Sequence, residues 1–235
     1  MDNRPPLGRA DLHIHPSGNW ADAETTTAIY EALRTSGLQV AVLSEHDRID
    51  VAKALVQRSN DEGISIELVV GEEVTTSQGH LLGIGLSERV PAGRPLGVTI
   101  ALVHEQGAIV VVAHPLLPAY LAAPGRLLIE LAEGDPDRRP DALEGMHPTA
   151  AWFPGWRRRV ERLAGRCGYA VVGGSDAHTA RSVGRVWTSF PGTNATDLYA
   201  AIQSRQTSTE GRRHALRDIF RGHGRRSNED SDPPG

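Results

Sequence analysis

Hydrophobic and polar positions follow two alternating patterns along most of the chain. Short apolar runs, typical of buried strands, are separated by segments with an apolar residue at every third or fourth position, typical of amphipathic helices. The apolar runs predict strands at 10–15, 39–43, 66–70, 79–85, 108–113, 141–145, 169–172 and 186–190. The other pattern predicts helices at 24–35, 50–62, 98–106, 119–133, 155–166 and 195–205. This alternation predicts an α/β domain with a largely parallel sheet.

The two ends of the chain differ from its centre. Residues 1–9 are predicted to form a flexible leader and residues 10–208 a single domain. Residues 209–235 are rich in Arg, Ser, Asp, Pro and Gly, and we predict a disordered tail there. The 235 residues are enough for one substantial hydrophobic core.

Composition excludes several classes of protein. The net charge of −4 gives no general preference for nucleic acid or for a membrane surface. The single cysteine, Cys167, excludes an intramolecular disulfide framework and a zinc site built from several cysteines. No apolar stretch approaches the roughly 18 residues that a membrane span needs. We therefore expect a soluble, cytoplasmic protein with no membrane partner and no stable nucleic-acid partner, in an oligomeric state that the sequence leaves open.

Residues suited to metal binding recur at the ends of the apolar runs. His13 and His15 are two residues apart on the first predicted strand, so their side chains share a face. Further histidines and carboxylates lie at or just past the ends of later strands, namely His46, Glu72, His114, Glu144, Asp176 and His178, and His80 lies near the start of another. In parallel α/β folds the active site lies at this edge, and a closed barrel gathers all strand ends around one mouth. The placement therefore favours a (β/α) barrel over an open sheet.

Histidine, aspartate and glutamate without cysteine are typical of catalytic Zn, Mn or Fe sites. The candidate ligands are His13, His15, His46, Glu72, His80, His114, Asp176 and His178. These are too many for one ion and predict two or three divalent ions, with Glu72 able to bridge two of them. Closely spaced ions activate a water and stabilise the oxygens of a phosphate. The residues predicted to take part most directly in catalysis are His13, His15, Glu72, His114 and Asp176.

Neighbours of these residues have predicted supporting roles. Glu45, Asp47 and Glu73 lie beside candidate ligands and are expected to accept hydrogen bonds from histidine rings. Arg48 and Arg181 follow the His46 and His178 segments, so we predict that they hold a substrate anion. His147 follows Glu144 closely but is not counted among the candidate ligands.

Six motifs in this order resemble the PHP (polymerase and histidinol phosphatase) family of metal-dependent phosphoesterases, over about residues 10–190. The first is Asp11-Leu12-His13-Ile14-His15, and the second, Ser44-Glu45-His46-Asp47, has Glu45 where the family usually has aspartate. The later ones are Gly71-Glu72, Gly79-His80, Ala113-His114-Pro115 and Ser175-Asp176-Ala177-His178. Among family members, the chain is most similar to the small stand-alone phosphoesterases.

The resemblance implies a distorted seven-stranded (β/α) barrel with up to three metal ions. By analogy, one ion takes His13, His15, Glu72 and Asp176, and a second shares Glu72 and adds His80 and His114. A third would use His46, His178 and a side chain of the first loop. Relatives commonly have an aspartate in that loop. This chain has Asn19 there, and Asp22 is the nearby carboxylate, so occupancy of the third site is left open. Glu144 matches a family glutamate that is usually not a direct ligand.

These observations predict hydrolysis of a phosphate ester with a metal-activated water. The expected substrate is a phosphomonoester, a nucleotide or a short oligonucleotide. Hydrolysis of a carboxyl or carbamate ester on the same fold is an alternative. An amidohydrolase bridged by a carboxylated lysine is disfavoured, because Lys53, the chain's only lysine, lies inside a predicted helix. A non-catalytic metal-binding module is the remaining alternative.

Overall fold

The computed structural model describes residues 6–17, 23–118, 121–148 and 153–211. The strands within them are β1 (Leu7–Ile14), β2 (Val40–Leu43), β3 (Glu67–Thr76), β4 (Gly79–Ile84), β5 (Ile109–Val112), β6 (Ala142–Met146), β7 (Ala170–Gly173), β8 (Val186–Pro191) and β9 (Ser208–Gly211). The helices are α1 (Ala23–Thr35), α2 (Asp50–Glu62), α3 (Leu96–His104), α4 (Gly125–Glu133), the 3-10 helix η1 (Pro136–Arg138), α5 (Trp156–Cys167) and α6 (Ala195–Gln203).

The strands form one curled sheet in the order β7-β6-β5-β4-β3-β2-β1-β8-β9. β1, β2 and β3 run parallel to one another, as do β5, β6 and β7, whereas β4 and β8 run antiparallel to their neighbours. The sheet closes where the segment after β7 meets β1: the Ala177 N–H donates to His13 O at 3.2 Å, and the His15 N–H donates to Ala177 O at 2.9 Å. The predicted α/β barrel is confirmed, with antiparallel strands distorting it.

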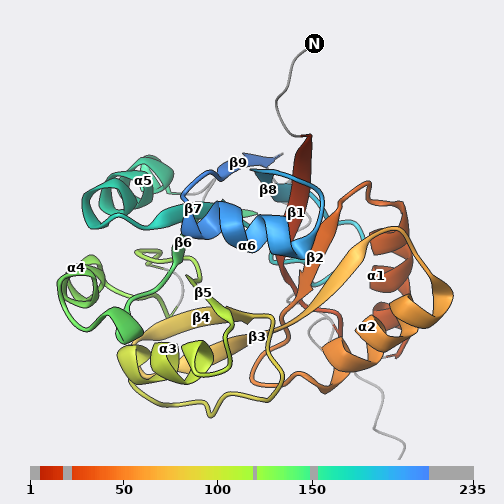
Figure 1. Ribbon diagram of the computed structural model, residues 1–235, viewed down its shortest axis with the longest axis horizontal. Coiled ribbons are helices and arrows are strands. Elements are labelled where there is room, and N and C mark those ends of the chain that lie inside the picture. Colours follow the sequence, from red (N-terminus) through yellow and green to blue (C-terminus); the bar gives the residue numbers. More distant parts are fainter. Residues whose placement is uncertain (1–5, 18–22, 119–120, 149–152, 212–235) are drawn as a thin grey trace, which may run out of the picture.

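The barrel interior is filled at one end and polar at the other. Residues of strands β1 to β8 form its apolar interior, among them Val42, Val111 and Val172. Helix α6 covers the end where the parallel strands begin, and it buries Leu198 and Ile202 against this core (Figure 1). This leaves the opposite end, where the parallel strands terminate, for the polar side chains.

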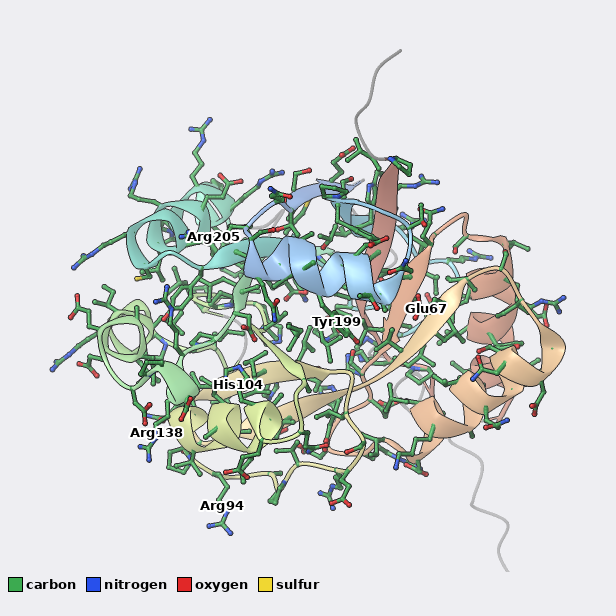
Figure 2. All side chains as sticks on the ribbon, in the orientation of Figure 1. Glu67, Arg94, His104, Arg138, Tyr199 and Arg205 are labelled. Atoms are coloured by element: carbon green, nitrogen blue, oxygen red, sulfur yellow. The ribbon has the colours of Figure 1, made fainter. Side chains whose placement is uncertain are left out.

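Two groups of helices pack on the outside of the barrel. Helices α1 and α2 lie together on one flank of the barrel, and α3, α4 and α5 lie on the opposite flank (Figure 1). The start of α6 is fixed to β3, because the Ala195 N–H donates to Glu67 Oε2 at 2.7 Å. Figure 2 shows Glu67 and Tyr199 at this covered end of the barrel. None of the described helices combines the length and apolar character that a bilayer crossing requires.

The ends of the domain differ from the predicted boundaries. Leu7 to Arg9 belong to β1, because they pair antiparallel with β8, so the predicted leader is too long by three residues. Strand β9 also pairs with β8 and extends the folded part beyond residue 208 to Gly211. The rest of the predicted tail, 212–235, lies outside the described residues. Helix α4 begins later than expected, at Gly125, directly after Pro124.

Candidate metal centre

Two histidines of β1 face the barrel interior because this strand has an extra residue. Leu12 belongs to the interior core, so strict alternation would also place Ile14 inside. Instead, between Asp11 and Ile14, strand β1 has one residue more than the paired segment of β2. Such a bulge reverses the alternation. Ile14 therefore packs in an outer core, and His13 and His15 are buried in the interior.

Strand β3 supplies the carboxylate at the middle of the cluster, and that carboxylate belongs to Glu73. The sequence pattern predicts Glu72 here, and the structure corrects that prediction. Because β3 continues beyond Val70, alternation places Glu73 on the same face as Val69, which lines the barrel interior. Glu72 lies on the opposite face, where its Oε2 accepts a hydrogen bond from the Val90 N–H at 2.8 Å.

The two carboxylate oxygens of Glu73 face two different groups of histidines. Oε1 lies 3.0 Å from His80 Nδ1 and 3.1 Å from His114 Nε2. Oε2 lies 3.1 Å from His13 Nε2 and 3.2 Å from His15 Nε2. Glu73 thus has the position that a carboxylate bridging two ions requires.

Asp176, in the segment after β7, completes the group around His13 and His15. Its Oδ1 lies 3.1 Å from His15 Nε2 and 3.5 Å from His13 Nε2, and these two nitrogens are 3.1 Å apart. The backbone of Asp176 is left-handed, with φ of 47°. A non-glycine residue seldom adopts this conformation unless its surroundings hold it, and such residues concentrate at functional sites.

A third group lies at the open side of the cluster. The side chains of His15, His46 and His178 place their ligand atoms within 4.8 Å of one another. The side chain of His46 is 48% exposed, whereas that of His15 is fully buried. His46 is thus the most solvent-exposed member of this group, ahead of His178 at 23%. Asn19 and Asp22, the candidates for completing this group, lie outside the described residues.

Carboxylates behind the histidines fix the orientation of the rings. Glu144 Oε1 lies 3.1 Å from His13 Nδ1, and Glu144 Oε2 accepts a hydrogen bond from the His114 N–H at 2.7 Å. Glu45 Oε1 lies 3.4 Å from His15 Nδ1, so Glu45 has the acceptor position that the sequence predicts. With Nδ1 donating to these carboxylates, both rings present Nε2 to the centre of the cluster.

Two aspartates hold the surrounding backbone. The Ser175 and Gly184 N–H groups each donate to Asp11 at 2.8 Å, which fixes the loop that contains Asp176 and His178. Burial raises the pKa of Asp11 to about 6. Asp47 accepts a hydrogen bond from the Thr75 N–H at 2.8 Å.

The charges of the cluster are strongly coupled. Burial lowers the pKa of His15, but its hydrogen bonds with Asp176, Glu45 and Glu73 outweigh this effect and raise it to about 10. Burial raises the pKa of Glu73, yet the surrounding imidazoles hold it well below its usual range. At His178 burial dominates and lowers the pKa to about 4. A divalent cation bound here would displace protons from the imidazoles and take over their role in balancing the carboxylates.

The donor set fits divalent ions better than it fits a hydrogen-bond network. His80 Nδ1 is buried without a hydrogen bond among the described residues, although Glu73 Oε1 is only 3.0 Å away. His13 and His15 direct two ring nitrogens at the same carboxylate oxygens. Ligand atoms bound to one ion at about 2.1 Å lie about 3.0 to 3.4 Å from one another, and the contacts above have this spacing. Nitrogen and oxygen donors of this kind suit Zn, Mn and Fe.

The structure thus brings together all the predicted ligands except Glu72, in the overlapping groups His13–His15–Glu73–Asp176, Glu73–His80–His114 and His15–His46–His178.

The predicted anion-binding arginines lie at the surface. The guanidinium of Arg48 makes two hydrogen bonds to Asp50, at 2.7 and 2.6 Å, and Arg181 is exposed. Their role stays a prediction.

Sequence reasoning left out His147, which the structure places in the cluster. His147 is buried, and its Nε2 lies 3.1 Å from Asp176 Oδ2. With His13 and Glu144 it forms a fourth group of closely spaced ligand-type atoms. Its place near the end of a strand, three residues after Glu144, is the feature of the sequence that points to it.

Comparison with known proteins agrees with this architecture. The model of the PHP-associated family matches residues 154–207. An uncharacterised protein of Methanocaldococcus jannaschii is 26% identical over 129 residues, which are 51% of this chain and 74% of that protein.

Two solved structures share the fold at low sequence identity. The first is a two-domain protein from Bacteroides vulgatus containing a predicted PHP-like metal-dependent phosphoesterase. Its TM-score is 0.69 and its sequence identity 16%, and the match covers 93% of this chain and 69% of the Bacteroides chain. The second is a lesion-specific endonuclease from Pyrococcus furiosus, with a TM-score of 0.58 and 15% identity over 92% of this chain and 66% of its own. The chain therefore shares the fold of these two structures, and its residues 154–207 match the PHP-associated family model.

Proposed function

We propose that the chain is a metal-dependent phosphoesterase, which hydrolyses a phosphate ester with water as the nucleophile. The observation on which this proposal depends is the position of Glu73, whose two oxygens each lie within 3.2 Å of a different pair of histidines. This is the arrangement that two closely spaced ions need. The fold shared with a predicted phosphoesterase and with an endonuclease supports the same reaction class.

The residues that would hold the ions follow from the groups described above. One ion would take His13, His15, Glu73 and Asp176, and a second would take Glu73, His80 and His114; a third would take His46 and His178. Closely spaced divalent ions lower the pKa of a water between them and stabilise the negative oxygens of a phosphate.

The protein's own contribution is to hold the ligands and to shape the approach. Glu144 and Glu45 hold the rings of His13 and His15 in one orientation, so that little reorganisation is needed when a substrate binds. The exposed side at His46 is where the substrate would enter. A phosphomonoester, a nucleotide or a short oligonucleotide is the proposed substrate class. Arg181 would bind the negative charge of the substrate, and Arg48 would do so once the substrate replaces Asp50 as its partner.

The proposal is tested by metal analysis together with three substrates that release the same coloured product. The metal content of the purified protein is measured by mass spectrometry. Hydrolysis of p-nitrophenyl phosphate, bis(p-nitrophenyl) phosphate and p-nitrophenyl acetate is then followed with Mn²⁺ added. We expect two or three ions per chain and hydrolysis of at least one phosphate ester. Hydrolysis of the acetate alone would assign the site to carboxyl esters. Fewer than one ion per chain, after Mn, Fe and Zn have each been supplied, would contradict any catalytic role.

A further inference from the structure

A change of register at the end of β6 turns His147 toward the metal centre. Ala142 lines the barrel interior, and Glu144 faces the same way. Between Glu144 and Met146, β6 advances by two residues while β7 advances by one. The bulge reverses the alternation of side chains, so that Met146 faces outward, where Arg157 contacts its sulfur at 3.7 Å. His147 therefore faces inward.

His147 fills the space behind two of the ligand groups. Its side chain is fully buried, and its ring centroid lies 5.3 Å from that of His114 and 6.2 Å from that of His13. Its Nε2 is 3.1 Å from Asp176 Oδ2, whereas the other oxygen of Asp176 faces His15. The two oxygens of Asp176 thus have different partners: one faces the proposed ion and the other faces His147.

We propose that His147 is a positioning residue for the metal centre, acting through Asp176. Its Nε2–H donates to Asp176 Oδ2, so that Oδ1 alone is presented to the ion shared with His13 and His15. The same hydrogen bond helps to hold Asp176 in its left-handed conformation, with φ of 47°. Strand β6 then supports the centre twice, through Glu144 behind His13 and through His147 behind Asp176. This inference rests on the metal centre of the proposed function.

The test compares the metal affinity of variants that differ in one hydrogen bond. His147→Phe keeps a flat ring but removes the donor, and His147→Gln restores an N–H donor. His104→Phe is the matched control: His104 Nε2 lies 3.2 Å from Asp141 Oδ2 in a similar pair outside the metal centre, at the end of α3 (Figure 2). Mn²⁺, and separately Zn²⁺, is titrated calorimetrically into each metal-free protein, and thermal unfolding of the metal-free proteins reports on the fold.

We expect H147F to bind the ion about 10- to 100-fold more weakly, the range found when a residue supporting a ligand is lost. H147Q should recover most of this loss, and H104F should bind like the wild type. Equal affinities of H147F and wild type would overturn the proposal, as would H147Q binding as weakly as H147F. If H147F does not fold, His147→Leu takes its place in the comparison. Because no substrate is present, a lack of phosphoesterase activity does not affect this result, whereas a wild-type protein that binds neither ion would refute both proposals.

Discussion

At the residue scale, two adjacent glutamates of β3 show how the face of a strand determines the chemistry of a side chain. Burial raises the pKa of Glu72 to about 7, because few groups nearby stabilise its negative charge. Burial also acts on Glu73, but the imidazoles of His13 and His114 outweigh it and lower the pKa of Glu73 well below its usual range. Although they are adjacent, Glu72 is a buried acid that is readily protonated, whereas Glu73 is an ionised carboxylate.

The matched substitutions Glu73→Gln and Glu72→Gln should separate these roles. Glu73→Gln removes the charge and one oxygen that face two histidine groups, so we expect loss of at least one bound ion. Phosphoesterase activity should fall by more than the 10- to 100-fold typical of supporting residues. Glu72→Gln keeps an acceptor for the Val90 N–H and should retain the wild-type metal content. Metal analysis and steady-state kinetics of both variants provide the check. Equal metal loss in the two variants would contradict this assignment.

His46, His114, Asp176 and His178 could be identified from the sequence because each follows an apolar run, and parallel strands bring such positions to one edge. Glu73 could not be distinguished from Glu72 in the same way, because the apparent end of the strand at Val70 hides its continuation. His147 and the inward turn of His13 both depend on bulges, which leave no clear mark in a sequence. Bulges of this kind are common next to active sites.

At the element scale, closure of the barrel depends on how closely the end of β7 approaches β1. A Cβ atom on Gly174 would lie 2.4 Å from His13 Cβ and 2.8 Å from His13 N. Real side chains do not approach that closely, so any other residue at 174 must push the two strands apart. The contact that closes the barrel is therefore also the contact that places His13 in the metal centre.

Gly174→Ala should accordingly destabilise the fold and weaken the centre, whereas Gly165→Ala should not. We expect Gly174→Ala to cost about 1 to 3 kcal/mol, the usual range for overpacking. Gly165 lies in α5, and a Cβ atom there would meet no neighbouring group within 4 Å, so alanine should stabilise the helix by about 0.5 to 1 kcal/mol. Denaturant unfolding of the metal-free proteins measures both effects. A Gly174→Ala protein as stable as the wild type would show that the strands can separate without penalty.

The strands that the sequence predicts best are those buried on both faces, such as β5, because an unbroken apolar run marks them. Strand β9 and the first residues of β1 escape prediction, because they are short and partly polar and are defined by their pairing with β8. The antiparallel direction of β4 is likewise a property of its neighbours, since the run from Gly79 to Ile84 has the same apolar character in either direction.

At the scale of the whole molecule, the metal centre joins segments from most of the sheet. Its residues come from β1, β3 and β4 and from the segments that follow β2, β5 and β7. The cluster brings carboxylates and imidazoles from these segments close together. Bound ions would thus cross-link parts of the chain that are far apart in sequence, and their free energy of binding would stabilise the entire barrel.

Removing the ions should therefore lower the thermal stability of the whole domain in one cooperative transition. A site held at 100 times its dissociation constant contributes about 2.7 kcal/mol. For a domain of this size each kcal/mol corresponds to roughly 2 to 4 °C, so we expect a chelator to lower the unfolding temperature by roughly 5 to 10 °C per site.

Differential scanning calorimetry before chelation, after chelation and after Mn²⁺ is restored makes the comparison. Glu73→Gln is the internal control, because it should respond much less to the added ion. An unfolding temperature that is the same with and without chelator would mean that the cluster does not hold ions tightly enough to cross-link the barrel.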